Sequence, residues 1–174
     1  MKKVFSLLLF FGLTFGQTYV EGDVVGDFGA DICYNGDGYW SYQAQGLGKV
    51  TFIASFATWW GPCQSEAPQL EAVYQDYLPS GNLEIITAGM DWNQPYSCES
   101  WATTFGQTFP VLDDNSGNAI YGLFGIGYVP HNVVIGGDGT VIYSQSGHNL
   151  NAILSAIEQG MENLVLDMDE DGIL

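Results

Sequence analysis

Cys63 is the residue whose type and position most directly predict chemistry in this chain. It follows Gly61-Pro62 and opens a stretch with helical spacing of apolar residues, so its thiol is expected in the first turn of a helix. The helix dipole lowers a thiol pKa there, and a pKa near 7 would leave about half of the thiol ionised at pH 7. Burial beneath Trp60 acts in the opposite direction, and at the ordinary pKa of about 8.5 only about 3% would be thiolate. The sequence leaves both states open.

Two further cysteines, Cys33 and Cys98, raise the question of pairing. In an oxidising compartment, three cysteines predict one disulfide and one spare thiol. Loop-closure entropy contributes about 4 kcal/mol for either Cys33–Cys98 or Cys63–Cys98, so it does not choose between them. Because Cys98 follows a strand beside which an N-terminal edge strand would lie, Cys33–Cys98 is favoured as a structural disulfide. Under the other pairing, Cys98 would act as a resolving cysteine for Cys63.

The segment Trp59-Trp60-Gly61-Pro62-Cys63 resembles the W-C-G-P-C site of the thioredoxin superfamily. Its continuation, Cys63-Gln64-Ser65-Glu66-Ala67-Pro68, resembles the C-x-x-E-x-P pattern of the exported, TlpA-like redoxin branch. This resemblance implies a thioredoxin-like α/β fold over about residues 20–166, with a central mixed sheet and helices on both faces. It also implies thiol–disulfide chemistry on protein or small-molecule thiols, without a cofactor.

The chain departs from the family pattern at Trp60, which occupies the position of the attacking cysteine. Tryptophan has no nucleophile, so the ordinary two-cysteine cycle cannot run. Its ring would instead line a substrate groove with Trp59 and Val129. The resemblance also implies a cis peptide bond between Val129 and Pro130, with its backbone facing the active-site cysteines.

Two acid positions differ in what they imply for proton transfer. Ala54 stands where cytosolic thioredoxins have a buried aspartate, so that relay is absent. By analogy with the TlpA-like branch, Glu66 would move protons or tune the pKa of Cys63. Alternatively, Glu66 is a solvated carboxylate that the helix dipole stabilises in the first turn. Both interpretations remain open from the sequence.

Three functions are compatible with these residues. The favoured one is an exported redoxin with thiol–disulfide chemistry through Cys63, supported by Glu66 and Pro130. A second is a redox-inactive module that binds a peptide or protein in the Trp60 groove. The third, a peroxiredoxin-like thiol peroxidase using Cys63 with Cys98 resolving, has weak support. The threonine of the T-x-x-C motif is Trp60 here, and the chain has no arginine to bind peroxide.

Hydrophobic periodicity predicts the elements that must position these residues. Strands are expected at 49–57 and 83–90, an extended piece at 109–112, and a hairpin at 132–135 and 140–144. Helices are expected at 63–77, 97–105, 118–124 and 151–166. Residues 22–40 predict turns with short extended pieces. Parallel connections followed by an antiparallel pair and a terminal helix fit the implied fold.

The first residues indicate export, and the net charge bears on the possible partners. Residues 1–16 resemble a signal peptide, because Lys2 and Lys3 precede an apolar run that is too short to span a bilayer. The thioredoxin-like domain would then occupy 17–166 in the periplasm or outside the cell. The chain has a formal net charge of −17. So acidic a surface disfavours nucleic acid and anionic membranes as partners, and no membrane insertion is expected.

Two further features predict little chemistry. Residues 167–174 are acidic, and Asp167, Asp169 and Asp171 match positions 1, 3 and 5 of a calcium loop. The chain stops before the acid of position 12, so an acidic tail is favoured over a truncated calcium loop. His131 and His148 are expected on the surface, and no cluster has zinc spacing.

Overall fold

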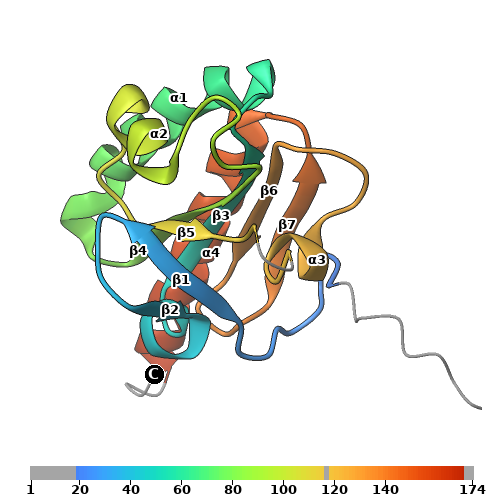
Figure 1. The fold of residues 1–174 in the computed structure, drawn as a ribbon. Helices are drawn as coiled ribbons and strands as arrows, with labels where there is room; N and C mark the ends of the chain where they lie inside the picture. Colours follow the sequence, from blue (N-terminus) through green and yellow to red (C-terminus); the bar gives the residue numbers. More distant parts are fainter. Residues whose placement is uncertain (1–18, 116–117, 171–174) are drawn as a thin grey trace, which may run out of the picture.

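The computed structural model describes residues 19–115 and 118–170, arranged around a seven-stranded mixed sheet (Figure 1). The expected signal peptide and Asp171 lie outside these residues. Along the sheet the strand order is β2-β1-β5-β4-β3-β6-β7. The strands are β1 (Gly29–Tyr34), β2 (Tyr39–Ser41), β3 (Val50–Ala57), β4 (Leu83–Met90), β5 (Val111–Asp113), β6 (His131–Ile135) and β7 (Val141–Ser146).

Helices and short helical turns connect these strands. They are η1 (Tyr42–Gly46), α1 (Gly61–Tyr77), η2 (Leu78–Ser80), α2 (Cys98–Phe105), α3 (Tyr121–Phe124) and α4 (Leu150–Glu170). The chain therefore has the thioredoxin-like α/β fold that the sequence predicts. The elements expected from periodicity are present, and most of their bounds differ from prediction by no more than three residues.

The centre of the sheet consists of parallel strands that are covered on both sides. All eight residues of β3 are buried, and β3 runs parallel to β4, which runs parallel to β5. Burial on both faces explains why β3 and β4 are mostly apolar in the sequence instead of alternating strictly between apolar and polar residues. On its other edge β3 pairs antiparallel with β6, and β6 with β7. The carboxyl end of β3 thus leads directly into α1 beside the start of β6.

The two faces of the sheet are covered differently. One face packs against the long helices, with Phe52 of β3 in the same cluster as Leu70 of α1 and Ile153 of α4. The opposite face packs Ile53 against Phe28 and Phe124, from the N-terminal segment and α3. Helices do lie on both faces, but among the described residues the second face is covered by the short elements α3 and η1 together with residues 19–28 (Figure 1).

The N-terminal region is more regular than its composition indicates. Residues 29–34 and 39–41 form a hairpin that extends the sheet, where isolated extended pieces were expected. The pairing partner also differs from the expectation. β1 pairs antiparallel with β5, which lies between it and β4. The turn-forming glycines and aspartates of this region obscured the short strands between them.

Helix α4 continues to Glu170, four residues past the end at 166 that apolar spacing predicts. Asp167 and Asp169 therefore have helical backbone instead of lying in an irregular tail. The calcium loop stays a prediction, because Asp171 lies outside the described residues. Among the side chains that the structure describes, no group of three or more His, Cys, Asp or Glu could hold a metal ion.

Charge within the fold is nearly all negative. Lys49, just before β3, forms a salt bridge with Glu84 of β4 at 3.2 Å. No helix within residues 19–115 and 118–170 is long and apolar enough to cross a membrane.

Candidate functional site

The site is built where β3 ends and α1 begins. Trp60 is the N-cap residue of α1, with extended backbone and no side-chain capping hydrogen bond. Pro62 occupies the first turn, where its missing N–H removes nothing from the helix. Cys63 follows in that turn, as the sequence predicts. The chain therefore presents an indole, and not a thiol, at the exposed N-terminus of the helix.

The Cys63 thiol is buried, with only 1% of the residue exposed. Phe56, Trp101 and Val111 belong to the same hydrophobic cluster. The pKa of the Cys63 thiol is raised to about 12, mainly by burial and also by the charge of Glu66, and a backbone hydrogen bond at Ala57 lowers it in part. Of the two ionisation states that the sequence leaves open, the structure therefore favours the protonated thiol. Almost all of the thiol is therefore protonated at pH 7.

Glu66 lies one turn beyond Cys63 and is also buried. Its Oε1 accepts a hydrogen bond from Asn132 Nδ2 at 2.7 Å and lies 2.7 Å from His148 Nδ1. The other ring nitrogen of His148 lies 3.3 Å from Gln69 Oε1. These contacts offset the cost of removing a carboxylate from water. Glu66 is therefore held by hydrogen bonds and is not the solvated first-turn carboxylate that was its alternative.

An apolar groove lies beside the thiol, and we call it the Trp groove. It has a volume of about 340 Å³ and is lined by Ala57, Trp59, Trp60, Met90, Asp91, Tyr121, Gly127, Tyr128 and Val129. Trp59 is 51% exposed and Trp60 39% exposed, with their rings edge to face. Trp59 Nε1 donates to Asp91 Oδ2 at 2.8 Å, which fixes that indole. The Val129–Pro130 bond on the other side is cis, and Pro130 is buried.

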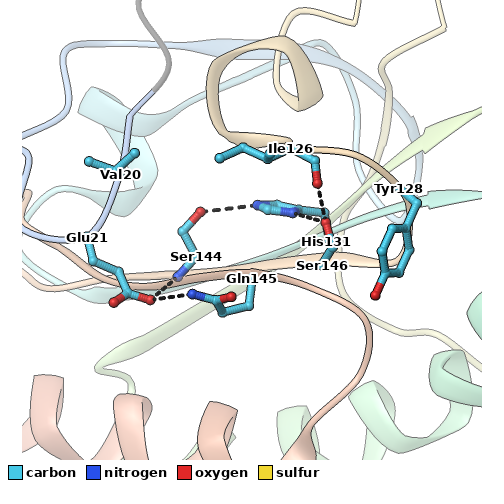
Figure 2. Close-up of a pocket in the computed structure, with 8 residues that line it drawn as sticks. All are labelled: Val20, Glu21, Ile126, Tyr128, His131, Ser144, Gln145 and Ser146. Carbon is cyan, nitrogen blue, oxygen red and sulfur yellow. Dashed lines mark hydrogen bonds between the residues drawn. The ribbon is translucent and has the colours of Figure 1, made fainter.

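The two histidines are not free surface residues, contrary to expectation. His131 is buried at the start of β6, with its ring between Ser144 and Ser146 of β7 (Figure 2). His148 is partly buried against Glu66. Along β6 successive side chains face opposite sides of the sheet, so Asn132 faces α1 while His131 faces away from it. A buried Asn–Glu–His arrangement was missed because its members come from three distant segments.

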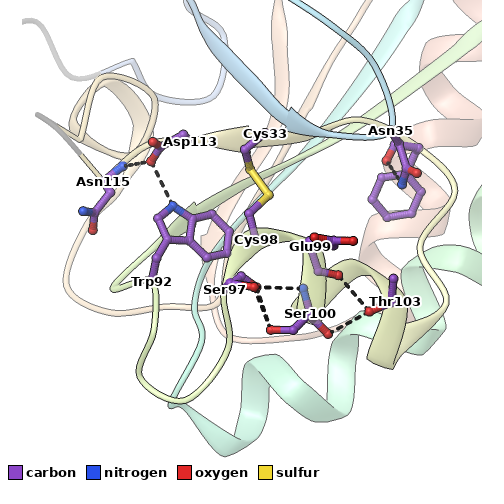
Figure 3. The surroundings of a disulfide bond; sticks show 11 residues. Cys33, Asn35, Trp92, Ser97, Cys98, Glu99, Ser100, Thr103, Asp113 and Asn115 are labelled. Carbon is purple, nitrogen blue, oxygen red and sulfur yellow. Dashed lines mark hydrogen bonds between the residues drawn. A yellow bond between two sulfur atoms is a disulfide. The ribbon is translucent and has the colours of Figure 1, made fainter.

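Cys33 and Cys98 form a disulfide between β1 and α2 (Figure 3). This is the pairing that the sequence favours, and it leaves Cys63 as the free thiol. Trp92 lies beside the bond and donates to Asp113 at 2.9 Å. With Cys98 engaged by Cys33, a Cys63–Cys98 cycle would first require that disulfide to open. Because Cys98 is bonded to Cys33, it is also not free to act as the resolving cysteine that the peroxidase alternative requires.

These features are a thioredoxin-like fold, a buried thiol in the first turn of α1, and an exposed tryptophan at the N-cap of that helix. The model of the AhpC/TSA family matches residues 22–144, and the chain belongs to this family.

Curated relatives carry names that fit this assignment. The thiol-disulfide oxidoreductase ResA of Bacillus thuringiensis (strain Al Hakam) is 33% identical over 95 residues, 55% of this chain and 53% of that protein. The thiol:disulfide interchange protein CycY of Rhizobium leguminosarum bv. viciae is 30% identical over 110 residues, 62% of this chain and 55% of that protein. The chain thus spans about half the length of the curated relatives it matches.

Solved structures show the same fold at lower identity. A thiol:disulfide interchange protein of the thioredoxin family from Chlorobium tepidum TLS superposes with a TM-score of 0.67 at 20% identity, covering 83% of this chain and 99% of its own. StoA from Bacillus subtilis gives 0.59 at 18% identity, covering 79% and 96%.

Proposed function

We propose that this chain is an exported redoxin that binds a thiol- or disulfide-bearing polypeptide in the Trp groove and is redox-silent at neutral pH. The polypeptide would lie between Trp59 and Trp60 on one side and Val129 on the other. This is a binding function on a fold that its relatives' names associate with thiol–disulfide exchange.

Trp60 is the observation that carries the proposal. At the N-terminus of α1 it replaces a nucleophile with a large ring that is still 39% exposed. Exposed tryptophans beside an apolar groove are typical anchors for a partner's side chains. Cys63 is meanwhile 1% exposed, and its raised pKa leaves almost no thiolate to attack a disulfide. The site therefore favours binding of a polypeptide over thiol–disulfide exchange with it.

Export is part of the proposal. Its support is the leader-like sequence of residues 1–16 together with the Cys33–Cys98 disulfide, since such bonds persist in oxidising compartments. No cofactor is proposed, and nucleic acid and anionic membranes are disfavoured as partners by the charge of −17. The calcium loop at Asp167, Asp169 and Asp171 remains a separate proposal that calcium titration of the full chain would test.

Binding to an unfolded test polypeptide would examine the Trp groove. The probe is one unfolded polypeptide whose single cysteine is kept reduced, titrated calorimetrically into the protein at pH 7. Replacing Trp60 by alanine is expected to weaken binding about tenfold, which corresponds to the loss of one anchor. Tyr39→Ala is the control, because Tyr39 is an exposed aromatic residue on strand β2, outside the Trp groove. Equal affinity of the wild type and Trp60→Ala would refute the proposal.

Exchange through Cys63 is a second candidate, favoured by one specific observation. The buried contacts of Glu66 with Asn132 and His148 lie one helical turn from the thiol and end at a partly exposed imidazole. Such a chain suits movement of a proton to and from Cys63. A mixed disulfide that forms at pH 7 with an activated disulfide, and that Cys63→Ser abolishes, would support this function. No adduct within hours would reject it.

A further inference from the structure

A second polar cluster lies on the opposite face of the sheet from Glu66. His131 of β6 sits between two serines of the neighbouring strand β7 (Figure 2). Its Nδ1 lies 3.0 Å from Ser146 Oγ, and its Nε2 lies 3.1 Å from Ser144 Oγ. The redoxin site uses none of these groups.

The hydrogen bonds fix which ring nitrogen carries the proton. The Ser146 hydroxyl donates its one hydrogen to the carbonyl oxygen of Ile126, so towards His131 it acts as an acceptor. Nδ1 of His131 therefore carries a proton and donates to Ser146. Burial lowers the pKa of the His131 imidazole, which favours the neutral ring. Nε2 then accepts from the Ser144 hydroxyl, which is the arrangement of a serine activated by a base whose orientation a third group holds.

A pair of donors converges beside the same serine. The backbone N–H of Ser144 and the side-chain Nε2 of Gln145 both donate to Oε1 of Glu21, at 3.2 and 3.1 Å. Two N–H groups aimed at one anionic oxygen are what stabilises the oxyanion of a tetrahedral intermediate. The Glu21 oxygen stands in for that oxyanion. Glu21 is exposed, so its side chain has room to turn into solvent.

These groups line a cavity of about 470 Å³. Val20, Ile126 and Tyr128 add apolar surface to its polar floor of serines and histidine. That volume and mixture are typical of sites for small organic ligands. The apolar part suits a short acyl chain, while its carbonyl oxygen would replace Glu21 Oε1.

We propose that Ser144, His131 and Ser146 form a second site that hydrolyses small carboxylic esters. Ser144 Oγ attacks the carbonyl carbon while its proton passes to His131 Nε2, and Ser144 N–H and Gln145 hold the oxyanion. The intermediate collapses, His131 returns the proton to the departing alkoxide, and an acyl-serine remains. Water then attacks with His131 as base, which releases the acid and restores the serine. Ser146 is a positioning residue. Its neutral hydroxyl stabilises an imidazolium less than a carboxylate would, so slow turnover of activated esters is expected.

Covalent labelling would test this site. The probe is a fluorophosphonate, incubated with the full chain at pH 7.5, followed by intact mass and peptide mapping. We expect one adduct, on Ser144, with hydrolysis of p-nitrophenyl butyrate that falls at least about 100-fold in Ser144→Ala. Ser155→Ala is the control, since Ser155 is exposed on α4. Glu21→Ala should accelerate labelling by emptying the oxyanion position.

The outcomes separate this proposal from the redoxin function. Labelling and hydrolysis report on Ser144, whereas calorimetric binding of the polypeptide reports on Trp60, so a failure of either function is seen independently of the other. Absence of an adduct on Ser144, or hydrolysis equal in the wild type and Ser144→Ala, would overturn the proposal. The circular dichroism spectrum of Ser144→Ala, expected to match the wild type, guards against loss of fold.

Discussion

Oε1 of Glu66 lies 2.7 Å from Nδ1 of His148, although 82 positions separate the two residues in the sequence. The contact joins α1 to the connection between β7 and α4, beside the buried thiol. It places a carboxylate that is 2% exposed against an imidazole that is 18% exposed. The pair therefore combines a structural role with a route from the interior of the site to solvent.

Replacing His148 by alanine should destabilise the fold, because the buried carboxylate of Glu66 loses one of its donors. We expect the free energy of unfolding in urea at pH 7 to fall by about 2 kcal/mol. In a Glu66→Gln background the same replacement should cost much less, since no buried charge remains. Asn151→Ala, an exposed change on α4, serves as control. Equal losses in both backgrounds would contradict the pairing.

Alkylation of Cys63 should be slow at neutral pH and should accelerate with pH. Since the pKa is raised to about 12, the thiolate fraction and the rate increase about tenfold per pH unit from 7 to 10. Glu66→Gln should increase the rate at each pH, because the negative charge of Glu66 is one cause of the raised pKa. Iodoacetamide kinetics followed by mass spectrometry measure both effects. A rate that levels off below pH 9 would be inconsistent with the buried thiol.

The same thiol predicts how stability depends on pH. Its pKa rises from 9.0 to about 12 on folding, so the folded state holds the proton more tightly than the unfolded state. That contribution is fully present below pH 9 and is lost as pH rises towards 12, with a slope of up to about 1.4 kcal/mol per pH unit. Cys63→Ala should lack it. Urea denaturation of both proteins from pH 8 to 10.5 should give free energies of unfolding whose difference changes with pH, and parallel curves would refute the prediction.

Trp60→Cys should restore thiol–disulfide exchange. The new thiol would occupy the exposed N-terminus of α1, where the dipole lowers its pKa, with Cys63 as its resolving partner. We expect the reduction of insulin disulfides by dithiothreitol to be at least about tenfold faster than with the wild type. Trp60→Ser, which removes the ring without adding a thiol, should give no gain. Lack of activity in a folded variant would indicate that the site has lost more than its nucleophile.

Removal of the Cys33–Cys98 disulfide should destabilise the fold by about 2–4 kcal/mol, because the bond closes a loop of 65 residues. Unfolding of the wild type with and without reductant measures the loss. The double variant Cys33→Ala/Cys98→Ala should match the reduced wild type and be insensitive to reductant. Cys63→Ala should keep the response to reductant, and its disappearance would point to a different pairing.

The sequence predicts the central part of the fold because local patterns there agree with burial. Residues 83–90 form β4 with the expected bounds, since a short, mostly apolar segment that is bounded by turn residues is typical of a strand covered on both sides. The β1–β2 hairpin was missed because its pairing depends on contact with β5, and no short-range pattern encodes that contact. The same applies to the end of α4 at Glu170, beyond the last apolar position used to define it.

For the candidate site residues, the sequence predicts their places in the fold and not their surroundings. Cys63, Glu66 and Pro130 occupy the expected positions on α1 and before β6. Whether the pKa of Cys63 is raised or lowered depends on packing against Trp101 and Val111, which lie in later elements. His148 and Asn132 reach Glu66 only through the folded sheet, so a turn histidine in Ser-Gly-His-Asn gave no sign of its partner.

The Lys49–Glu84 bridge has a consequence for encounters in solution. Within the described residues Lys49 is the only lysine, so the other acids have no lysine or arginine partner and the potential around the fold is negative. The association rate of a polypeptide therefore depends on its charge, and basic chains associate faster than acidic ones. Salt removes this difference in association rate, because the electrostatic screening length falls from about 10 Å at 0.1 M to about 3 Å at 1 M. In concentrated salt we expect the association rate to be independent of the charge of the polypeptide. Contact with the two tryptophans alone would then determine which polypeptide remains bound.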